Sequence, residues 1–186
     1  MRIVAGRFGG RPLRGPTSDA IRPTSDRLRE SLFNILEHGL DDPIPGARVI
    51  DVFAGTGAVA LEALSRGATF ALMVEDGAEA RALIRDNIET LGVGGETRIF
   101  RRDARKLGAA PAGDPFDLAF LDPPYGKGLA ELALVALRDG GWVKPGGLFI
   151  VEEAASTVFH PPSGFDRLEQ RTFGDTTVYF LRRLQT

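Results

Sequence analysis

From residue 48 onwards, short apolar runs alternate with longer stretches in which apolar residues recur every three or four positions. The short runs predict buried strands, and the longer stretches predict helices that pack on one face. The predicted strands cover residues 48–53, 70–74, 97–100, 118–121 and 148–151, and the predicted helices cover 58–65, 78–91 and 129–138. Strands that alternate with helices in this way form a parallel sheet covered by helices. We therefore predict an α/β fold with a Rossmann-like, mostly parallel sheet.

The last part of the chain has a different pattern. Residues 142–147 combine Trp142 with a proline and two glycines, and they predict a turn in which the tryptophan packs over the core. Residues 167–173 and 176–181 flank the dipeptide Gly174-Asp175. A Gly-Asp turn between such runs is typical of an antiparallel hairpin, which we expect to close the sheet.

Residues 1–40 are predicted to form a small basic extension of a main domain that covers residues 41–186. Gly9-Gly10 separates two short apolar pieces and predicts a small, poorly cored β-hairpin. After a polar loop, Thr24 or Ser25 can cap a helix that runs to about residue 37. Phe33 lies at the margin of the apolar face of this helix. That face is formed by Leu28, Leu32, Ile35 and Leu36.

Charge is distributed unevenly along the 186 residues. The net charge is −2, but residues 1–30 hold seven arginines against three acids, a net of +4 that leaves −6 for the remainder. A basic segment on an acidic body indicates contact with a polyanion such as RNA at one place, although a solvated arm without a partner has the same composition. The candidate RNA contacts are Arg2, Arg7, Arg11, Arg22, Thr24, Arg27 and Lys127.

The chain contains no cysteine. This excludes disulfides, thiolate metal sites and cysteine nucleophiles, and with them pyrimidine C5 methylation, which needs a thiolate adduct. His38 and His160 lie apart in loop-like contexts, so we expect no metal. The chain also lacks an apolar run of about 18 residues, so we expect no transmembrane helix. We further expect a cytoplasmic protein that has no membrane contact and acts as a monomer.

The strongest candidate chemistry follows the strand predicted at residues 118–121, in the sequence Asp122-Pro123-Pro124-Tyr125. The prolines lack N–H groups, so they end the strand and hold the preceding carbonyl in an extended geometry. The Asp122 carboxylate and the Asp122 or Pro123 carbonyl can accept both protons of an exocyclic amine, while Tyr125 stacks on the attached ring. The alternative is that residues 122–125 form a turn that only ends the strand, with Asp122 as a solvated loop acid. Asp-Pro-Pro-Tyr resembles the signature of amino-group methyltransferases that use S-adenosylmethionine (SAM).

A second candidate site follows the strand at residues 48–53. The loop Ala54-Gly55-Thr56-Gly57 precedes a helix whose N-terminus offers free N–H groups. Its spacing also fits the NAD fingerprint, but the acid Asp51 would repel a pyrophosphate, whereas it suits the cationic methionine end of SAM. Glu75 and Asp103 follow the next two strands and can accept from the ribose hydroxyls and the adenine amine. The candidate cofactor residues are Asp51, Phe53, Ala54, Gly55, Thr56, Gly57, Glu75, Asp103 and Ala104.

With these motifs in place, nearly the whole chain resembles the RsmD family of bacterial SAM-dependent methyltransferases, which act on guanine N2 in small-subunit ribosomal RNA. The resemblance rests on residues 2–6, 22–30, 51–57, 61–67 and 122–125. It implies a seven-stranded sheet with a final antiparallel hairpin, an N-terminal arm that helps to hold RNA, and 16S rRNA in an assembling or assembled ribosomal particle as the substrate. It also implies SAM as methyl donor and S-adenosylhomocysteine as product.

Two other functions fit the same residues. The acceptors at Asp122 also suit the adenine N6 or cytosine N4 amine of RNA or DNA. A nucleotide-binding module without catalysis, such as an NAD-binding or assembly protein, would use the glycine loop alone. The hypothesis we prefer is a guanine-N2 methyltransferase in which Asp122 and the Pro123 carbonyl direct the amine towards the methyl group.

Overall fold

The computed structural model describes residues 1–185, whose strands form one seven-stranded sheet in the order β3-β2-β1-β4-β5-β7-β6. β1 to β5 are parallel, and β7 runs antiparallel to both β5 and β6. The predicted sheet and closing hairpin are thereby confirmed. The strands are β1 Arg48–Val52, β2 Phe70–Val74, β3 Thr97–Phe100, β4 Phe116–Leu121, β5 Val143–Ala154, β6 Phe165–Phe173 and β7 Thr176–Arg183.

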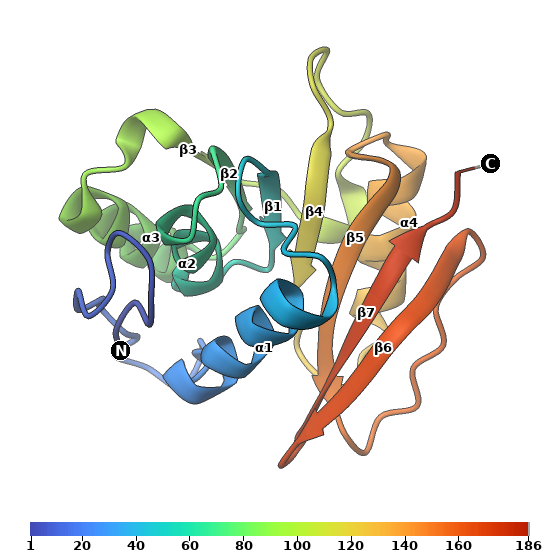
Figure 1. Cartoon of the computed structure of the whole chain (residues 1–186), viewed down its shortest axis with the longest axis horizontal. Helices are drawn as coiled ribbons and strands as arrows, with labels where there is room; N and C mark the ends of the chain where they lie inside the picture. Colours follow the sequence, from blue (N-terminus) through green and yellow to red (C-terminus); the bar gives the residue numbers. More distant parts are fainter. Residues whose placement is uncertain (186) are drawn as a thin grey trace.

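Four α-helices cover the sheet in two layers, with α1, α2 and α3 on one face and α4 on the other (Figure 1). Their bounds agree with the predicted helices to within two residues, and Ser25 caps α1 by accepting from the Leu28 N–H. The helices are α1 Asp26–Gly39, α2 Ala58–Ser65, α3 Ala78–Leu91 and α4 Leu129–Asp139, with short 3₁₀ turns η1 Gly94–Glu96 and η2 Ala104–Lys106. Among the described residues, no helix is long and apolar enough to cross a membrane.

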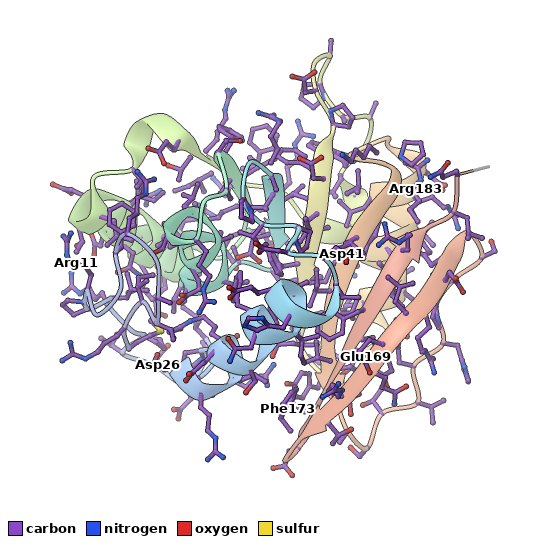
Figure 2. All side chains as sticks on the ribbon, in the orientation of Figure 1. Arg11, Asp26, Asp41, Glu169, Phe173 and Arg183 are labelled. Carbon is purple, nitrogen blue, oxygen red and sulfur yellow. The ribbon has the colours of Figure 1, made fainter. Side chains whose placement is uncertain are left out.

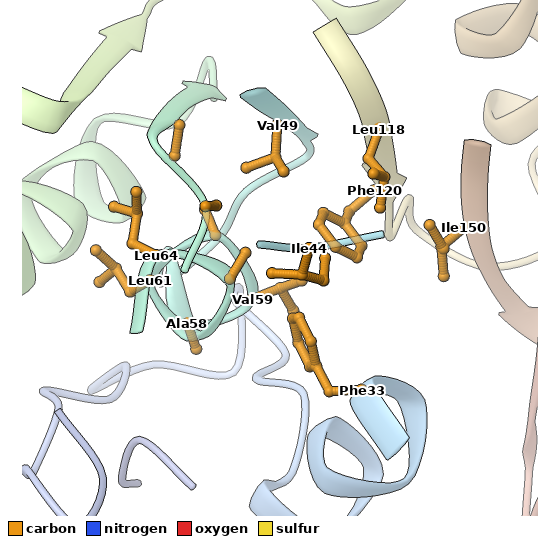
Figure 3. Packing of buried hydrophobic residues seen from close by; sticks show 14 of the residues in the cluster. Phe33, Ile44, Val49, Ala58, Val59, Leu61, Leu64, Leu118, Phe120 and Ile150 are labelled. Carbon is orange, nitrogen blue, oxygen red and sulfur yellow. The ribbon is translucent and has the colours of Figure 1, made fainter. Parts of the chain in front are cut away.

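The two faces of the sheet bury separate apolar clusters because successive strand residues point to opposite sides. In β4, Leu118 and Phe120 join the cluster under α1 to α3, whereas Ala119 and Leu121 join the cluster under α4. Phe33 reaches from α1 towards Phe120, with ring centroids 5.8 Å apart (Figure 3). The predicted position of Phe33 at the margin of the apolar face of α1 is wrong, because its ring is buried against β4.

The N-terminal segment is part of the main core. Backbone hydrogen bonds join its two arms, from the Ile3 N–H to the Arg11 carbonyl, from the Gly10 N–H to the Ile3 carbonyl and from the Leu13 N–H to the Met1 carbonyl, and Ile3 and Leu13 are both buried in the cluster under α1 to α3. The expected hairpin is therefore short, and the expectation that it is poorly cored is wrong. Glu62 of α2 anchors it by accepting from the backbone N–H groups of Val4 and Ala5.

Of the residues predicted as a turn at 142–147, residues 143–147 form the first part of β5, and Trp142 directly precedes it. Trp142 is buried and donates from Nε1 to the Gly108 carbonyl. The pairing between β4 and β5 is irregular at this point, so the glycines are absorbed in a bulge rather than ending the strand. A side chain at Gly147 would come within 2.4 Å of Val143 Cγ1, which explains why glycine is required there.

Candidate active site

A cavity of about 800 Å³ opens at the carboxyl ends of the parallel strands. It lies where the strand order changes direction, because the chain passes from β3 at one edge to β4 on the far side of β1. Open α/β sheets bind ligands at such a point. The cavity is lined by every predicted cofactor residue except Gly57, and by Asp122, Pro123, Pro124, Arg22, Thr24 and Lys127 from the other predicted sets.

The loop after β1 turns sharply into α2. Phe53, Gly55 and Gly57 all have positive φ, at 62°, 60° and 80°, and Gly57 is the N-cap of α2 without a side-chain cap. A Cβ at Gly57 would lie 3.2 Å from Met73 Sδ, so the glycine also permits close packing of the loop on β2. The role of Gly57 is thus to shape the loop, while Gly55 lines the cavity.

Glu75, predicted to accept from ribose hydroxyls, also fastens the two loops of the site together. One oxygen accepts from the Gly55 N–H at 2.8 Å, and the other accepts from the Gly77 N–H at 3.0 Å. Each carboxylate oxygen has further acceptor capacity, so these bonds orient the group and leave it able to accept from a ligand. Sequence reasoning placed the carboxylate at this edge but missed its backbone partners.

Asp51 lies at the end of β1 and is 3% exposed. Its Oδ2 atom is buried without a hydrogen-bond partner among the described residues. Burial, and then the nearby charge of Asp122, raises the pKa of Asp51 well above the ordinary value. A buried carboxyl that faces a cavity in this state lacks a cation, and it marks the place where a positively charged ligand group would be stabilised.

Asp103, predicted to meet the adenine amine, caps η2 through a bond from the Arg105 N–H to Oδ1 at 2.9 Å. The Arg105 guanidinium also contacts both carboxylate oxygens. These bonds lower the pKa of Asp103 to about 2. Asp103 and Ala104 line the cavity as expected, but the carboxylate already has a cationic partner.

Asp122 ends β4 and is paired with a residue from the predicted N-terminal arm. Arg22 Nη2 donates to Asp122 Oδ1 at 2.9 Å, and Thr24 Oγ1 lies 3.4 Å from Asp122 Oδ2. The side chain of Asp122 is 19% exposed. Burial raises its pKa to about 6, although Arg22 and Thr24 act in the opposite direction. The strongest sequence candidate is therefore a largely buried carboxyl at the mouth of the cavity.

Tyr125, the predicted stacking platform, does not line the cavity itself. Its hydroxyl bonds to Thr176 Oγ1 at 2.9 Å, which fixes the ring on β7. The guanidinium carbon of Arg22 lies 3.7 Å from the ring centroid, so one face of the ring is already covered by a flat cation. A nucleobase can stack there only after Arg22 has moved.

The remaining predicted RNA contacts do not gather at this mouth. Arg7 pairs with Glu96, and Arg11 Nη2 donates to the Thr90 carbonyl at 2.7 Å, so both lie against the end of α3. Arg2 Nη1 donates to the Gly10 carbonyl at 3.0 Å. Arg27 lines a separate groove with Phe173, and Figure 2 shows Arg11 and Phe173 on opposite sides of α1.

Glu152 is a site residue to which sequence reasoning assigned no role. It follows Val151 of β5, which pairs with Leu121 of β4, so Glu152 comes beside Asp122 in the sheet. It is 4% exposed and its Oε2 lies 3.4 Å from Thr24 Oγ1. The signal that could have found it is the one that found Asp122, an acid directly after an apolar run that predicts a buried parallel strand.

A family model described as "Conserved hypothetical protein 95" matches residues 1–182. The chain belongs to this family, the RsmD family that its motifs resemble. The chain is 41% identical to ribosomal RNA small subunit methyltransferase D of Escherichia coli K12 over 153 aligned residues. The alignment covers 82% of this chain and 74% of that protein. The protein with the same name from Haemophilus influenzae is 33% identical over 176 residues, covering 94% and 89%.

Two solved structures share the whole fold. A putative methyltransferase from Escherichia coli matches with a TM-score of 0.84 and 31% identity over 100% of this chain and 99% of that chain. A putative methylase from Haemophilus influenzae matches with a TM-score of 0.78 and 31% identity over 98% of both chains. The correspondence includes the N-terminal segment and the closing hairpin, and so covers both elements that flank the Asp122 site.

Proposed function

We propose that this RsmD-family chain is a SAM-dependent methyltransferase that methylates the exocyclic N2 amine of a guanine in small-subunit (16S) ribosomal RNA. The names of the relatives support methylation of small-subunit ribosomal RNA. The observation in the structure that carries the proposal is the position of Asp122-Pro123-Pro124 in the wall of the cavity that also contains Asp51 and Gly55. A methyl donor and an acceptor for an amine therefore share one cavity.

The charge of the cavity suits SAM better than NAD. Seven acidic and four basic residues line it, and two of the basic ones, Arg22 and Arg105, are already paired with Asp122 and Asp103. A pyrophosphate would meet an excess of negative charge at this wall, whereas SAM carries a cationic amine and a cationic sulfur. Asp51 is suited to hold the amine, the 54–57 loop to pass beneath the nucleoside, and Glu75 to accept from the ribose.

Bound SAM supplies an electrophilic methyl group on a positively charged sulfur that departs as a neutral thioether. The difficulty lies with the guanine amine, whose lone pair is delocalised into the ring. The Asp122 carboxylate and the Pro123 carbonyl can each accept one amine proton, which directs the lone pair towards the methyl group. The amine becomes cationic as the bond forms, and the Asp122 charge stabilises it before it loses a proton.

Tyr125 supports the flat face of the target base. Its hydroxyl contact with Thr176 keeps the ring in place while Arg22 departs. Stacking on an aromatic side chain contributes about 1–3 kcal/mol per base, and the target base must leave any helix to reach it. Asp122 and Tyr125 together thus bind the amine edge and the face of the same base.

The RNA approaches from the side of the N-terminal extension, which we propose as residues 1–40 on a methyltransferase domain of residues 41–186. Arg22, Thr24 and Lys127 lie at the mouth of the cavity. Arg27 lines a separate groove on α1, and Arg7 and Arg11 lie against the end of α3, so these arginines and Arg2 would contact RNA outside the cavity. The proposed substrate is an assembling small ribosomal subunit, on which the protein would act as a monomer.

Methyl transfer to ribosomal particles tests this function. The purified chain is incubated with methyl-labelled SAM and small ribosomal subunits from cells that lack the corresponding enzyme, and label in the RNA is counted. Calorimetry with S-adenosylhomocysteine and with NAD tests the cofactor in parallel. We expect label in the subunit RNA and binding of S-adenosylhomocysteine alone, whereas NAD binding without transfer would identify a nucleotide-binding module and contradict the proposal.

A further inference from the structure

Two carboxyl groups lie side by side where β4 ends next to β5. Leu121 pairs with Val151 in the parallel register, so Asp122, the first residue after β4, comes beside Glu152, which remains in β5 and pairs with Val178 of β7. Thr24 Oγ1 lies 3.4 Å from Asp122 Oδ2 and also 3.4 Å from Glu152 Oε2. The proposed mechanism uses Asp122, but it gives no role to Glu152, although Glu152 is the more deeply buried of the two.

Glu152 lacks a donor of its own. The contact with Thr24 is the single hydrogen bond of its side chain among residues 1–185, and a hydroxyl has only one proton to share between the two carboxyls. Burial and the charge of Asp122 raise the pKa of Glu152 well above its ordinary value, so its carboxylate form needs a hydrogen-bond donor that only a ligand would bring. Its neighbour Glu153, by contrast, accepts from the Gly126 and Ala154 N–H groups. Glu152 can therefore accept a hydrogen bond from a ligand, because the described residues leave most of its acceptor capacity unused.

Arg22 shows what kind of group this corner accepts. Its guanidinium stacks 3.7 Å above the Tyr125 ring centroid and donates to Asp122 at 2.9 Å. Guanine carries the same arrangement of atoms, since its N1, C2, N2 and N3 form a guanidine fragment in the plane of the ring. The guanidinium of Arg22 donates to the Asp122 carboxyl and lies over the Tyr125 ring, and the guanidine fragment of guanine could occupy the same place.

We propose that Glu152 is a specificity-determining residue that accepts the N1–H of guanine while Asp122 accepts from the N2 amine, and that Arg22 occupies this place until the RNA displaces it. The inference rests on the proposed methyltransferase function and adds the readout of the base. Arg22 and Thr24 belong to one segment that lines the cavity in front of Glu152, so withdrawal of that segment uncovers both carboxyls together.

Paired acceptors distinguish guanine from the other bases with an amine. Guanine presents two neighbouring donors, N1–H and N2–H, on one edge. Adenine and cytosine present an amine next to an unprotonated ring nitrogen, which is an acceptor and would face Glu152 without a proton between them. A site built around a hydrogen bond rejects an analogue that cannot form it, because its own polar group is left unpaired.

The test replaces one donor of the base and leaves the reacting amine in place. The methyl-accepting position is first mapped with the wild-type protein on unmodified small subunits, and then reconstituted particles are prepared with guanine or 2-aminopurine at that position. 2-Aminopurine keeps the exocyclic amine but lacks N1–H and also O6, so the effect of N1–H is read from the change in preference between the wild type and the Glu152 variants. We compare kcat/KM on the two particles for the wild type, Glu152→Gln, Glu152→Asp and the control Glu169→Gln, which alters a partly exposed acid on β6 that pairs with Arg171.

We expect the wild type and Glu169→Gln to prefer guanine over 2-aminopurine by about 100-fold, and Glu152→Gln to reduce that preference to within about 10-fold. Glu152→Asp keeps the charge but withdraws the carboxyl, so it should reduce the preference even if Glu152→Gln folds poorly. S-adenosylhomocysteine affinity should be unchanged, because Glu152 does not line the cofactor cavity.

A guanine preference that is the same in the wild type and both variants overturns the inference. No transfer to guanine by the wild type refutes the proposed function, and the inference with it.

Discussion

Arg22 donates from Nη2 to Oδ1 of Asp122 at 2.9 Å, although 100 positions separate the two residues in the chain. The contact joins the segment before α1 to the end of β4, and it brings the one arginine that stacks on Tyr125 to the carboxyl proposed to hold the target amine. Substrate binding and release of this arginine are therefore linked, because the target base and the Arg22 guanidinium cannot contact the same carboxyl and the same ring face at once.

Replacing Asp122 with asparagine should reduce kcat by about 100-fold or more and leave S-adenosylhomocysteine affinity within about 3-fold of the wild type. The amide offers an oxygen acceptor but no negative charge, so it cannot stabilise the cationic amine that forms during transfer. Single-turnover methylation and calorimetry measure the two quantities. Asp166→Asn, an exposed change on β6, is the matched control, and a wild-type rate for Asp122→Asn would remove Asp122 from the chemistry.

The activity should depend on pH through Asp122. Its pKa is raised to about 6, mainly by burial, so kcat/KM should rise with pH and level off above about 6 as the carboxylate forms. Asp122→Asn should lack this limb of the profile. A flat profile between pH 5 and 7 for the wild type would show that the ionised form is not needed.

The same pKa shift predicts how stability changes with pH. Because the pKa of Asp122 is higher in the folded protein than in the unfolded chain, the folded state binds more protons between about pH 4 and 6, and the free energy of unfolding falls as pH rises through that window. Relative to Asp122→Asn, the wild type should lose about 1–3 kcal/mol between pH 4 and 7. Urea titrations of both proteins at each pH measure the difference, and a constant difference would contradict the shift.

Glu75→Gln should weaken S-adenosylhomocysteine binding by about 10-fold or more and lower the melting temperature. One amide position would present N–H groups to the backbone N–H of Gly55 or Gly77, so one of the two bonds that tie the loops together is lost. Glu89→Gln, the same change at an exposed position on α3, controls for the loss of charge. Unchanged affinity in Glu75→Gln would show that these loops do not shape the cofactor site.

Neutralising Arg22 and Arg27 should weaken RNA binding. It should also reduce the slope of log K for RNA binding against log salt concentration by about one to two, because each lost phosphate contact releases one counterion fewer. Arg14→Gln is the control, since Arg14 pairs with Asp86 on α3. Binding of small-subunit RNA is measured at several salt concentrations. A salt dependence equal to that of the wild type would assign these arginines to packing alone.

The parallel strands and the positions of their terminal acids could be predicted from sequence, because a buried strand that stops at a charged residue carries both signals locally. Asp51, Glu75, Asp103 and Asp122 all lie at the predicted edge. The partners of these acids could not be predicted, since Arg22 reaches Asp122 only through the tertiary fold.

The failures have equally physical causes. Lys144-Pro145-Gly146-Gly147 carries strong turn signals, but the sheet absorbs them as a bulge in β5. The N-terminal hairpin has few apolar residues of its own, but it contributes Ile3 and Leu13 to a core formed elsewhere in the chain.

The central claim is that a guanine amine meets the methyl donor above the end of β4. Its most direct test is the identity of the methylated nucleoside, obtained by digesting small-subunit RNA after reaction with isotope-labelled SAM and analysing it by mass spectrometry. We expect labelled N2-methylguanosine with the wild type and its loss with Asp122→Asn. Labelled N6-methyladenosine or N4-methylcytidine in its place would show that the site methylates a different amine.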